Sequence, residues 1–196
     1  MPPTDPDLPD LVDSHCHLDF PDLIGETEAI LARARAAGVN RVATICTRLR
    51  NEPAVRALAE AHPGVFYAPA PHPMSPHEEP LATVEALVPL ARHPRFVGIG
   101  ETGLDYHYTA ETKAIQQTSL RLHIEAAQET GLPLIIHARD ADEDMERILA
   151  EGMARKPYAC VMHCFSSGPR LAEAALEMGF TRDDTATSSP GRRSTG

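Results

Sequence analysis

The chain has 196 residues, of which 42% are hydrophobic and 23% are charged, a balance typical of a globular protein with one substantial core. Its formal net charge of −10 argues against a basic nucleic-acid-binding surface, although bound divalent cations could supply positive charge locally. No apolar run reaches the roughly 18 residues of a membrane span, and the Pro-rich start lacks the basic and apolar regions of a signal peptide.

The four cysteines lie in apolar, strand-like stretches and show no paired C-x-x-C spacing. Reduced cysteine behaves there as a small hydrophobe, and with no secretion signal this predicts a reducing, cytoplasmic location. Three regions are predicted: an acidic, Pro-rich N-terminal tail over residues 1–9, one folded unit over 10–180, and a disordered polar tail over 181–196.

Hydrophobic periodicity and end signals predict six strands that alternate with helices along the chain. The first strand is the apolar run that leads into a His-x-His pair, His15 and His17. The later strands are predicted at 41–46, 65–68, 96–101, 132–137 and 158–163. The helices are predicted at 27–37, 51–61, 81–92, 112–130, 142–154 and 169–178.

This alternation implies parallel strands that are joined by right-handed crossovers, and therefore an α/β fold. The strands are nearly continuous apolar runs, as expected where helices cover the sheet. Both a doubly wound sheet and a (β/α)8 barrel fit the alternation. The position of the polar residues has to separate the two.

Ionisable residues end the predicted strands at the end that leads into the following helix. They are His15 and His17 in strand one, Glu101 in strand four, His137 in strand five and His163 in strand six. In a parallel barrel these strand ends converge on one face, where active sites are built. Four imidazoles and a carboxylate suit Zn²⁺, Mn²⁺ or Mg²⁺. A single such histidine is more often a solvated loop residue, but five in register predict a shared metal site.

Four motifs together resemble the TatD family of metal-dependent deoxyribonucleases, in the family's order and over residues 11–180. They are SHCHLD at 14–19, GIGETGLDY at 98–106, LIIHARDA at 134–141 and HCFSSG at 163–168. The resemblance implies a (β/α)8 TIM-type barrel, phosphodiester hydrolysis, typically in DNA, and two divalent metal ions at the strand ends. It also implies that the five strand-end residues are metal ligands, with Glu101 bridging the ions.

Two further residues are candidate substrate contacts. Arg139, two residues after His137, is positioned to bind a phosphate oxygen with its guanidinium fork, and a salt bridge to Asp140 or Asp142 is an equal alternative. His72, followed by Pro73, matches a His-Pro loop of the family that would contact substrate. Additional prolines before His72 fix φ and remove backbone donors, so this loop is expected to differ from that of the family.

The chain after Phe180 is polar, and we interpret this change as a truncated or out-of-frame end. A Glu-Thr-Asp motif, whose Asp the resemblance implies to be a ligand and proton acceptor, is absent, so the catalytic residue stays open. About six βα units cannot close an eight-stranded barrel, and an incomplete barrel is expected. Alternatives to a nuclease are a non-catalytic metal-binding fragment and a hydrolase of the same superfamily that acts on an amide or lactone.

Overall fold

The computed structural model describes residues 11–75 and 77–182, and every strand in these ranges pairs in parallel with its neighbour. The first half contains β1 (Leu11–Cys16), α1 (Pro21–Ile24), α2 (Thr27–Ala36), β2 (Val39–Cys46), η1 (Leu49–Asn51), α3 (Glu52–Ala61), β3 (Val65–Pro69) and α4 (Val84–Leu90). The second half contains β4 (Ile99–Asp105), η2 (Ala110–Thr112), α5 (Lys113–Thr130), β5 (Leu134–Arg139), α6 (Asp142–Arg155), β6 (Cys160–Met162), α7 (Pro169–Glu177) and β7 (Thr181–Arg182).

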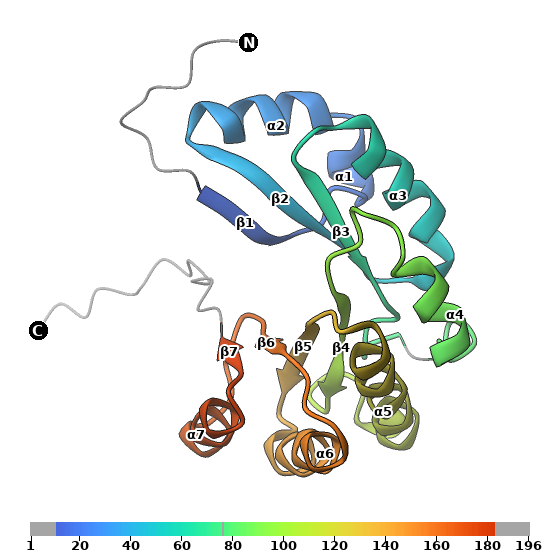
Figure 1. Ribbon diagram of the computed structural model, residues 1–196, viewed down its shortest axis with the longest axis vertical. Coiled ribbons are helices and arrows are strands. Elements are labelled where there is room, and N and C mark those ends of the chain that lie inside the picture. The colour runs from blue at the N-terminus through green and yellow to red at the C-terminus, as the bar shows by residue number, and fades with distance from the viewer. Residues whose placement is uncertain (1–10, 76, 183–196) are drawn as a thin grey trace, which may run out of the picture.

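The strands form one curved wall. Its hydrogen-bonded order is β1-β2-β3 in one sheet and β4-β5-β6-β7 in the other. Tyr67 of β3 joins the sheets, because its N–H donates to the Arg95 carbonyl at 2.9 Å and its carbonyl accepts from the Val97 N–H at 3.0 Å. The helices lie along the outer side of the wall, and β1 and β7 lie at its two ends (Figure 1).

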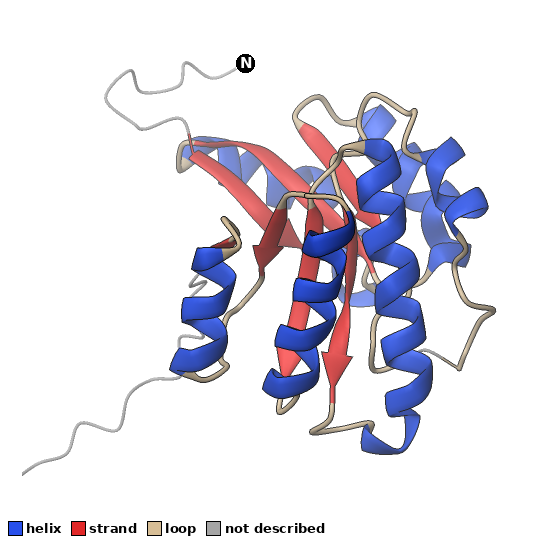
Figure 2. Ribbon diagram, turned by 60° about the horizontal axis from the view of Figure 1, so that its bottom comes forward, coloured by secondary structure: helices blue, strands red, loops and turns tan. Residues whose placement is uncertain are grey.

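Within the described residues β1 and β7 each have a single hydrogen-bonded neighbour, so the wall does not close. Figure 2 shows the helices α5, α6 and α7 standing side by side against the strands. The predicted α/β fold, an incomplete barrel of parallel strands with helices outside, is confirmed. Among the described helices, none is both long enough and apolar enough to cross a membrane.

The two faces of the wall carry different residues. Successive side chains of a strand point to opposite faces, and the main core, between strands and helices, contains Leu134 and Ile136 of β5. Ile135, between them, belongs instead to a separate buried cluster with Ile45 and Ala68. This second cluster therefore lies on the concave face. His137 follows Ile135 by two positions and shares that face.

β4 and β5 extend beyond their predicted ends. Glu101 is therefore the third residue of β4 and not its last, as predicted, because residues 102–105 continue to pair in register with 136–139. The continued pairing requires Gly103, since a Cβ at this position would lie 1.9 Å from the His137 carbonyl oxygen. The short helix α1 was not predicted.

The predicted polar tail begins with two residues that form a strand. Thr181 and Arg182 make up β7, which pairs with β6, and both residues are exposed. Residues 183–196 and the N-terminal tail over 1–9 lie outside the described residues. The three-region division of the chain thus stays a prediction.

A buried histidine on α5, separate from the strand-end residues predicted above, makes the free energy of unfolding depend on pH. His123 of α5 is fully buried, and its Nδ1 donates to the Ser119 carbonyl at 2.7 Å while Nε2 has no partner. Burial lowers the pKa of His123 from its usual 6.5 to about 4. The unfolded chain therefore binds a proton that the native chain does not. The stability linked to His123 is complete above about pH 6.5 and is lost as the pH falls toward about 4.

The free energy of unfolding of the unsubstituted chain should fall between about pH 7 and about pH 4. In His123→Leu we expect this fall to be smaller by about 3 kcal/mol. Urea unfolding at both pH values measures it. The matched control is His77→Gln, because His77 is exposed and its replacement should leave the difference unchanged. An equal effect of both substitutions would contradict the burial argument.

Candidate metal centre

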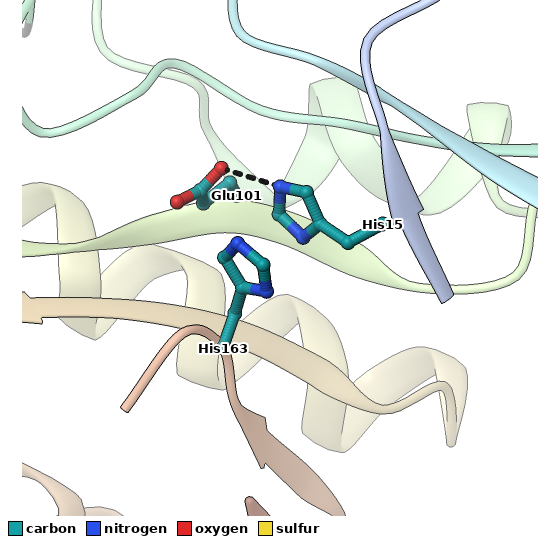
Figure 3. Close-up of side chains that lie close together, drawn as sticks. All are labelled: His15, Glu101 and His163. Atoms are coloured by element: carbon teal, nitrogen blue, oxygen red, sulfur yellow. Dashed lines mark ion pairs between the residues drawn. The ribbon is translucent and has the colours of Figure 1, made fainter. Parts of the chain in front are cut away.

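Glu101 lies at the centre of a cluster of histidines on the concave face. Its Oε2 lies 3.0 Å from Nε2 of His15, and its Oε1 lies 3.3 Å from Nδ1 of His137 and 3.4 Å from Nε2 of His72. The Glu101 side chain is only 5% exposed, and a carboxylate that far from water needs such partners. Figure 3 shows His15, Glu101 and His163 converging from different parts of the wall.

The donor atoms fall into two groups that share Glu101. One group is His15, Glu101 and His163, and the other is His72, Glu101 and His137; within each group the donor atoms lie within 4.8 Å of one another. Each group offers two imidazole nitrogens and one carboxylate oxygen. This donor set suits Zn²⁺ and related divalent ions.

His15 has buried polar atoms that a cation would satisfy. Its side chain is 4% exposed, and neither ring nitrogen makes an aligned hydrogen bond, although Nε2 lies close to Glu101. The ring stacks on His163, with centroids 3.3 Å apart and planes 7° apart. A buried, unpaired polar atom costs about 1–3 kcal/mol, so the residues present fit a metal ion here.

The structure brings His17 beside the cluster but outside both donor groups. Its Nδ1 donates to the Ile45 carbonyl at 2.9 Å, and a carbonyl can only accept. Nε2 of a neutral His17 therefore carries the lone pair, which is the form that binds a metal. The His17 ring lies edge-on to His15 at 5.1 Å and stacks on Phe20 at 4.5 Å.

Asp105 orients His137, a contact that the sequence reasoning missed. Its Oδ2 accepts from His137 Nε2 at 3.0 Å, and the lone pair of a neutral ring is then on Nδ1, which faces Glu101. Asp105 is fully buried, and its backbone N–H and carbonyl both bond to the Gln116 amide, at 2.7 and 3.0 Å. The sequence did contain a signal for this contact. Asp105 is a carboxylate four residues after Glu101, and in one strand this spacing places both side chains on the same face.

His72 reaches Glu101 despite the prolines in its loop. The backbone N–H of His72 donates to the Thr47 carbonyl at 3.0 Å, and this bond holds the loop against the segment after β2. Its Nδ1 accepts from the Met74 N–H at 3.2 Å, so a neutral ring has its proton on Nε2. In that tautomer Nε2, 3.4 Å from Glu101 Oε1, bears a hydrogen and has no lone pair for a cation. Binding a cation there requires the other tautomer, whose Nδ1–H would face the Met74 N–H.

Arg139 is exposed, and its guanidinium lies over the Tyr108 ring, 4.9 Å from the centroid. The alternative salt bridges do not form among the described residues. Asp140 pairs with His107 at 2.8 Å, and Asp142 accepts from the Gly168 N–H at 2.8 Å. The N–H groups of Arg139 therefore carry no ion pair within the described part of the chain.

A cavity of about 420 Å³ lies over the cluster. It brings together all predicted site residues except the buried His15: His17, His72, Glu101, His137, Arg139 and His163. Phe20, Arg48 and Met74 also line it.

Charge coupling within the cluster controls its protonation. Burial alone would raise the pKa of Glu101, but the imidazoles of His137, His15 and His72 close to its oxygens outweigh burial and hold this pKa well below its usual range. Burial alone would lower the pKa of His137, but Glu101 and Asp105 raise it. A proton on His137 thus competes with any cation, and divalent ions should bind more weakly as the pH falls.

The part of the chain that contains the four motifs also matches known proteins. The model of the family described as "TatD related DNase" matches residues 12–183. The chain belongs to this family. The resemblance expected from the four motifs is confirmed.

Three TatD relatives give the extent of the likeness. The metal-dependent hydrolase YcfH of Escherichia coli K12 is 38% identical over 175 residues, 87% of this chain and 64% of YcfH. A protein of Escherichia fergusonii called "3'-5' ssDNA/RNA exonuclease TatD" is 32% identical over 155 residues, 79% of this chain and 59% of its own length. The crystal structure of YJJV, a TatD homologue of Escherichia coli K12, matches with a TM-score of 0.80 at 30% identity, over 88% of this chain and 67% of that one. The chain thus spans just under two thirds of the length of YcfH.

We expect Asp105→Asn to weaken binding of Zn²⁺ or Mn²⁺ about 10- to 100-fold, because His137 loses the charged partner that fixes its tautomer. Calorimetric titration of the metal-stripped protein measures it. Asp140→Asn is the matched control, because Asp140 pairs with the half-exposed His107 and should bind metal as the unsubstituted chain does. Unchanged affinity in Asp105→Asn would contradict this role.

Proposed function

We propose that this chain carries the metal centre of a hydrolase that cleaves phosphodiester bonds, with DNA as the substrate. The supporting observation is the Glu101 carboxylate, whose two oxygens face two different groups of histidines. The proposed ligands of two divalent ions (Zn²⁺, Mg²⁺ or Mn²⁺) are His15, His17, Glu101, His137 and His163. The name of the Escherichia fergusonii relative, a "3'-5' ssDNA/RNA exonuclease", supports a nucleic-acid substrate.

His15, His17, Glu101, His137 and His163 would hold the two divalent ions, which when bound would supply Lewis acidity for a water and for the leaving oxygen of a phosphodiester. The residues of the chain supply the geometry. Asp105 keeps the proton of His137 on Nε2 and leaves Nδ1 free, and the Ile45 carbonyl does the reverse for His17 by holding its proton on Nδ1. Glu101 in its charged form offers one oxygen to each group.

His72 and Arg139 are the proposed substrate contacts. The Nε2–H of His72 is a donor beside Glu101. It can donate a hydrogen bond to a phosphate oxygen. Arg139 lines the same cavity and offers two parallel N–H groups, the arrangement that binds a phosphate best. Because the chain has a net charge of −10, such local positive groups are needed to hold a polyanion.

Two alternatives remain for this chain. One is a non-catalytic metal-binding fragment, in which the same side chains hold an ion without turnover. A hydrolase of amides or lactones would use the same ligands, because a donor set reports the metal and not the leaving group. Cytoplasmic location stays a prediction from the sequence.

Removal of metal tests the proposal directly. We expect the metal-loaded chain to cleave single-stranded DNA, and we expect chelator to abolish cleavage. Glu101→Gln should lower both metal content and rate, the rate by at least about 100-fold, because each donor group loses its anionic member. Elemental analysis and a gel assay give the two readouts. Glu125→Gln, on the exposed face of α5, is the control.

The outcomes separate the alternatives. Metal binding without chelator-sensitive cleavage supports the non-catalytic fragment. Cleavage of a lactone or dipeptide but not of DNA supports the amide or lactone hydrolase. Metal content that is unchanged in Glu101→Gln rejects the shared centre.

Arg139→Ala tests substrate binding separately from chemistry. We expect the substrate concentration for half-maximal rate to rise about tenfold with little change in kcat, because a phosphate contact that is made equally before and during reaction affects binding alone. Steady-state kinetics on a short oligonucleotide measure both constants. Arg147→Ala, which removes an exposed arginine paired with Asp144 and Glu151, should change neither; an equal effect would assign the result to general charge.

A further inference from the structure

Phe20 is an exposed aromatic ring at the metal cavity. It is 42% exposed and lines the cavity together with Glu101 and His137. One face of the ring stacks on His17, with centroids 4.5 Å apart and planes 13° apart. Phe20 is not one of the buried core residues, so core packing does not account for its position.

The backbone holds Phe20 rigidly. Its N–H donates to the His17 carbonyl at 3.2 Å, and its own carbonyl accepts from the N–H groups of Leu23 and Ile24, at 2.8 and 3.0 Å. These bonds fix both the turn after β1 and the start of α1. Because this backbone is already fixed and a Phe side chain has only two torsions, the ring loses little entropy when a ligand binds to it.

The surroundings match the parts of a nucleotide. The histidines and Glu101 contribute polar groups to the cavity, and Phe20 and Met74 are apolar residues in its lining. Its cations are Arg139 and Arg48, of which Arg48 pairs with Glu78. Single-stranded nucleic acids bind proteins through cationic groups that contact phosphates and aromatic rings that stack on bases. Every base has a π-face, so such stacking does not depend on sequence.

We propose that Phe20 is a base-stacking site for the nucleotide whose phosphate lies at the metal centre. This inference rests on the proposed function and narrows its substrate to a strand with an unpaired base at the reacting phosphate. The base occupies the ring face of Phe20 opposite His17. Duplex DNA, whose bases stack on one another, has to fray before it binds.

The sequence offers a clean optical test, because it contains no tryptophan. In Phe20→Trp the indole is the single tryptophan of the 196-residue chain. We expect its fluorescence to be quenched by a phosphorothioate oligothymidylate and not by an abasic oligomer of equal length. Ile24→Trp is the matched control, since Ile24 is exposed at the end of α1, the helix that follows Phe20, and is absent from the cavity lining. Its emission should change with neither oligomer.

A second variant separates stacking from support of His17. Phe20→Leu keeps apolar contact with the His17 ring but lacks a π-face. We expect it to weaken binding of oligothymidylate about 5- to 150-fold and to leave both abasic binding and metal content unchanged. Phe20→Tyr should restore the affinity. Leu23→Ala, an exposed apolar position outside the cavity, should have no effect.

The results distinguish this inference from the proposed function. Quenching by the oligothymidylate with selective loss in Phe20→Leu supports the stacking site, even if the native chain cleaves no DNA and the proposed hydrolysis fails. Equal weakening of both oligomers in Phe20→Leu, absence of quenching, or no binding of oligothymidylate to the native chain overturns the stacking site. In the first two of these cases, chelator-sensitive cleavage would leave the proposed hydrolysis standing.

Discussion

A single buried carboxylate joins the elements of this structure at its concave face. Glu101 of β4 lies within 3.0–3.4 Å of imidazoles that come from β1, from the loop after β3 and from β5. A charge removed from water costs several kcal/mol unless partners replace the solvent, so the strands must approach closely enough to supply them. The need of the buried Glu101 carboxylate for partners therefore accounts both for the close approach of the strands on the concave face and for the histidines gathered there.

The histidines differ in the atom that each presents, although the sequence shows only one residue type. His17 and His137 have one nitrogen committed to an oxygen acceptor, Ile45 O and Asp105 Oδ2. His72 instead accepts a backbone hydrogen bond at Nδ1. The backbone and one carboxylate therefore sort chemically equal side chains into lone-pair donors and a proton donor. This sorting separates the binding of a cation from the binding of an anion within one cavity.

The alternation of strands and helices could be predicted from the sequence alone, and the positions of His15, His137 and His163 near strand ends indicated that they share one face. Glu101 shares this face although it lies inside β4 and not at its end. The contact between Asp105 and His137 could not be predicted in detail, since it depends on β4 continuing past Glu101 in register with β5. The position of His72 depends on hydrogen bonds to a distant segment, which prolines in the sequence argued against. Phe20 gave no pattern, because a ring beside a cavity and a ring in a core look alike in a sequence.

The Gln116 amide has a consequence for the motions of the centre. Gln116 is fully buried on α5, the helix that also carries the core residues Leu120 and Ile124. Its bonds to both backbone groups of Asp105 couple the acceptor of His137 to the most deeply packed helix. Movement of the Asp105 backbone away from His137 then requires these hydrogen bonds to break or α5 to move with it, which ties this part of the centre to the buried part of the fold.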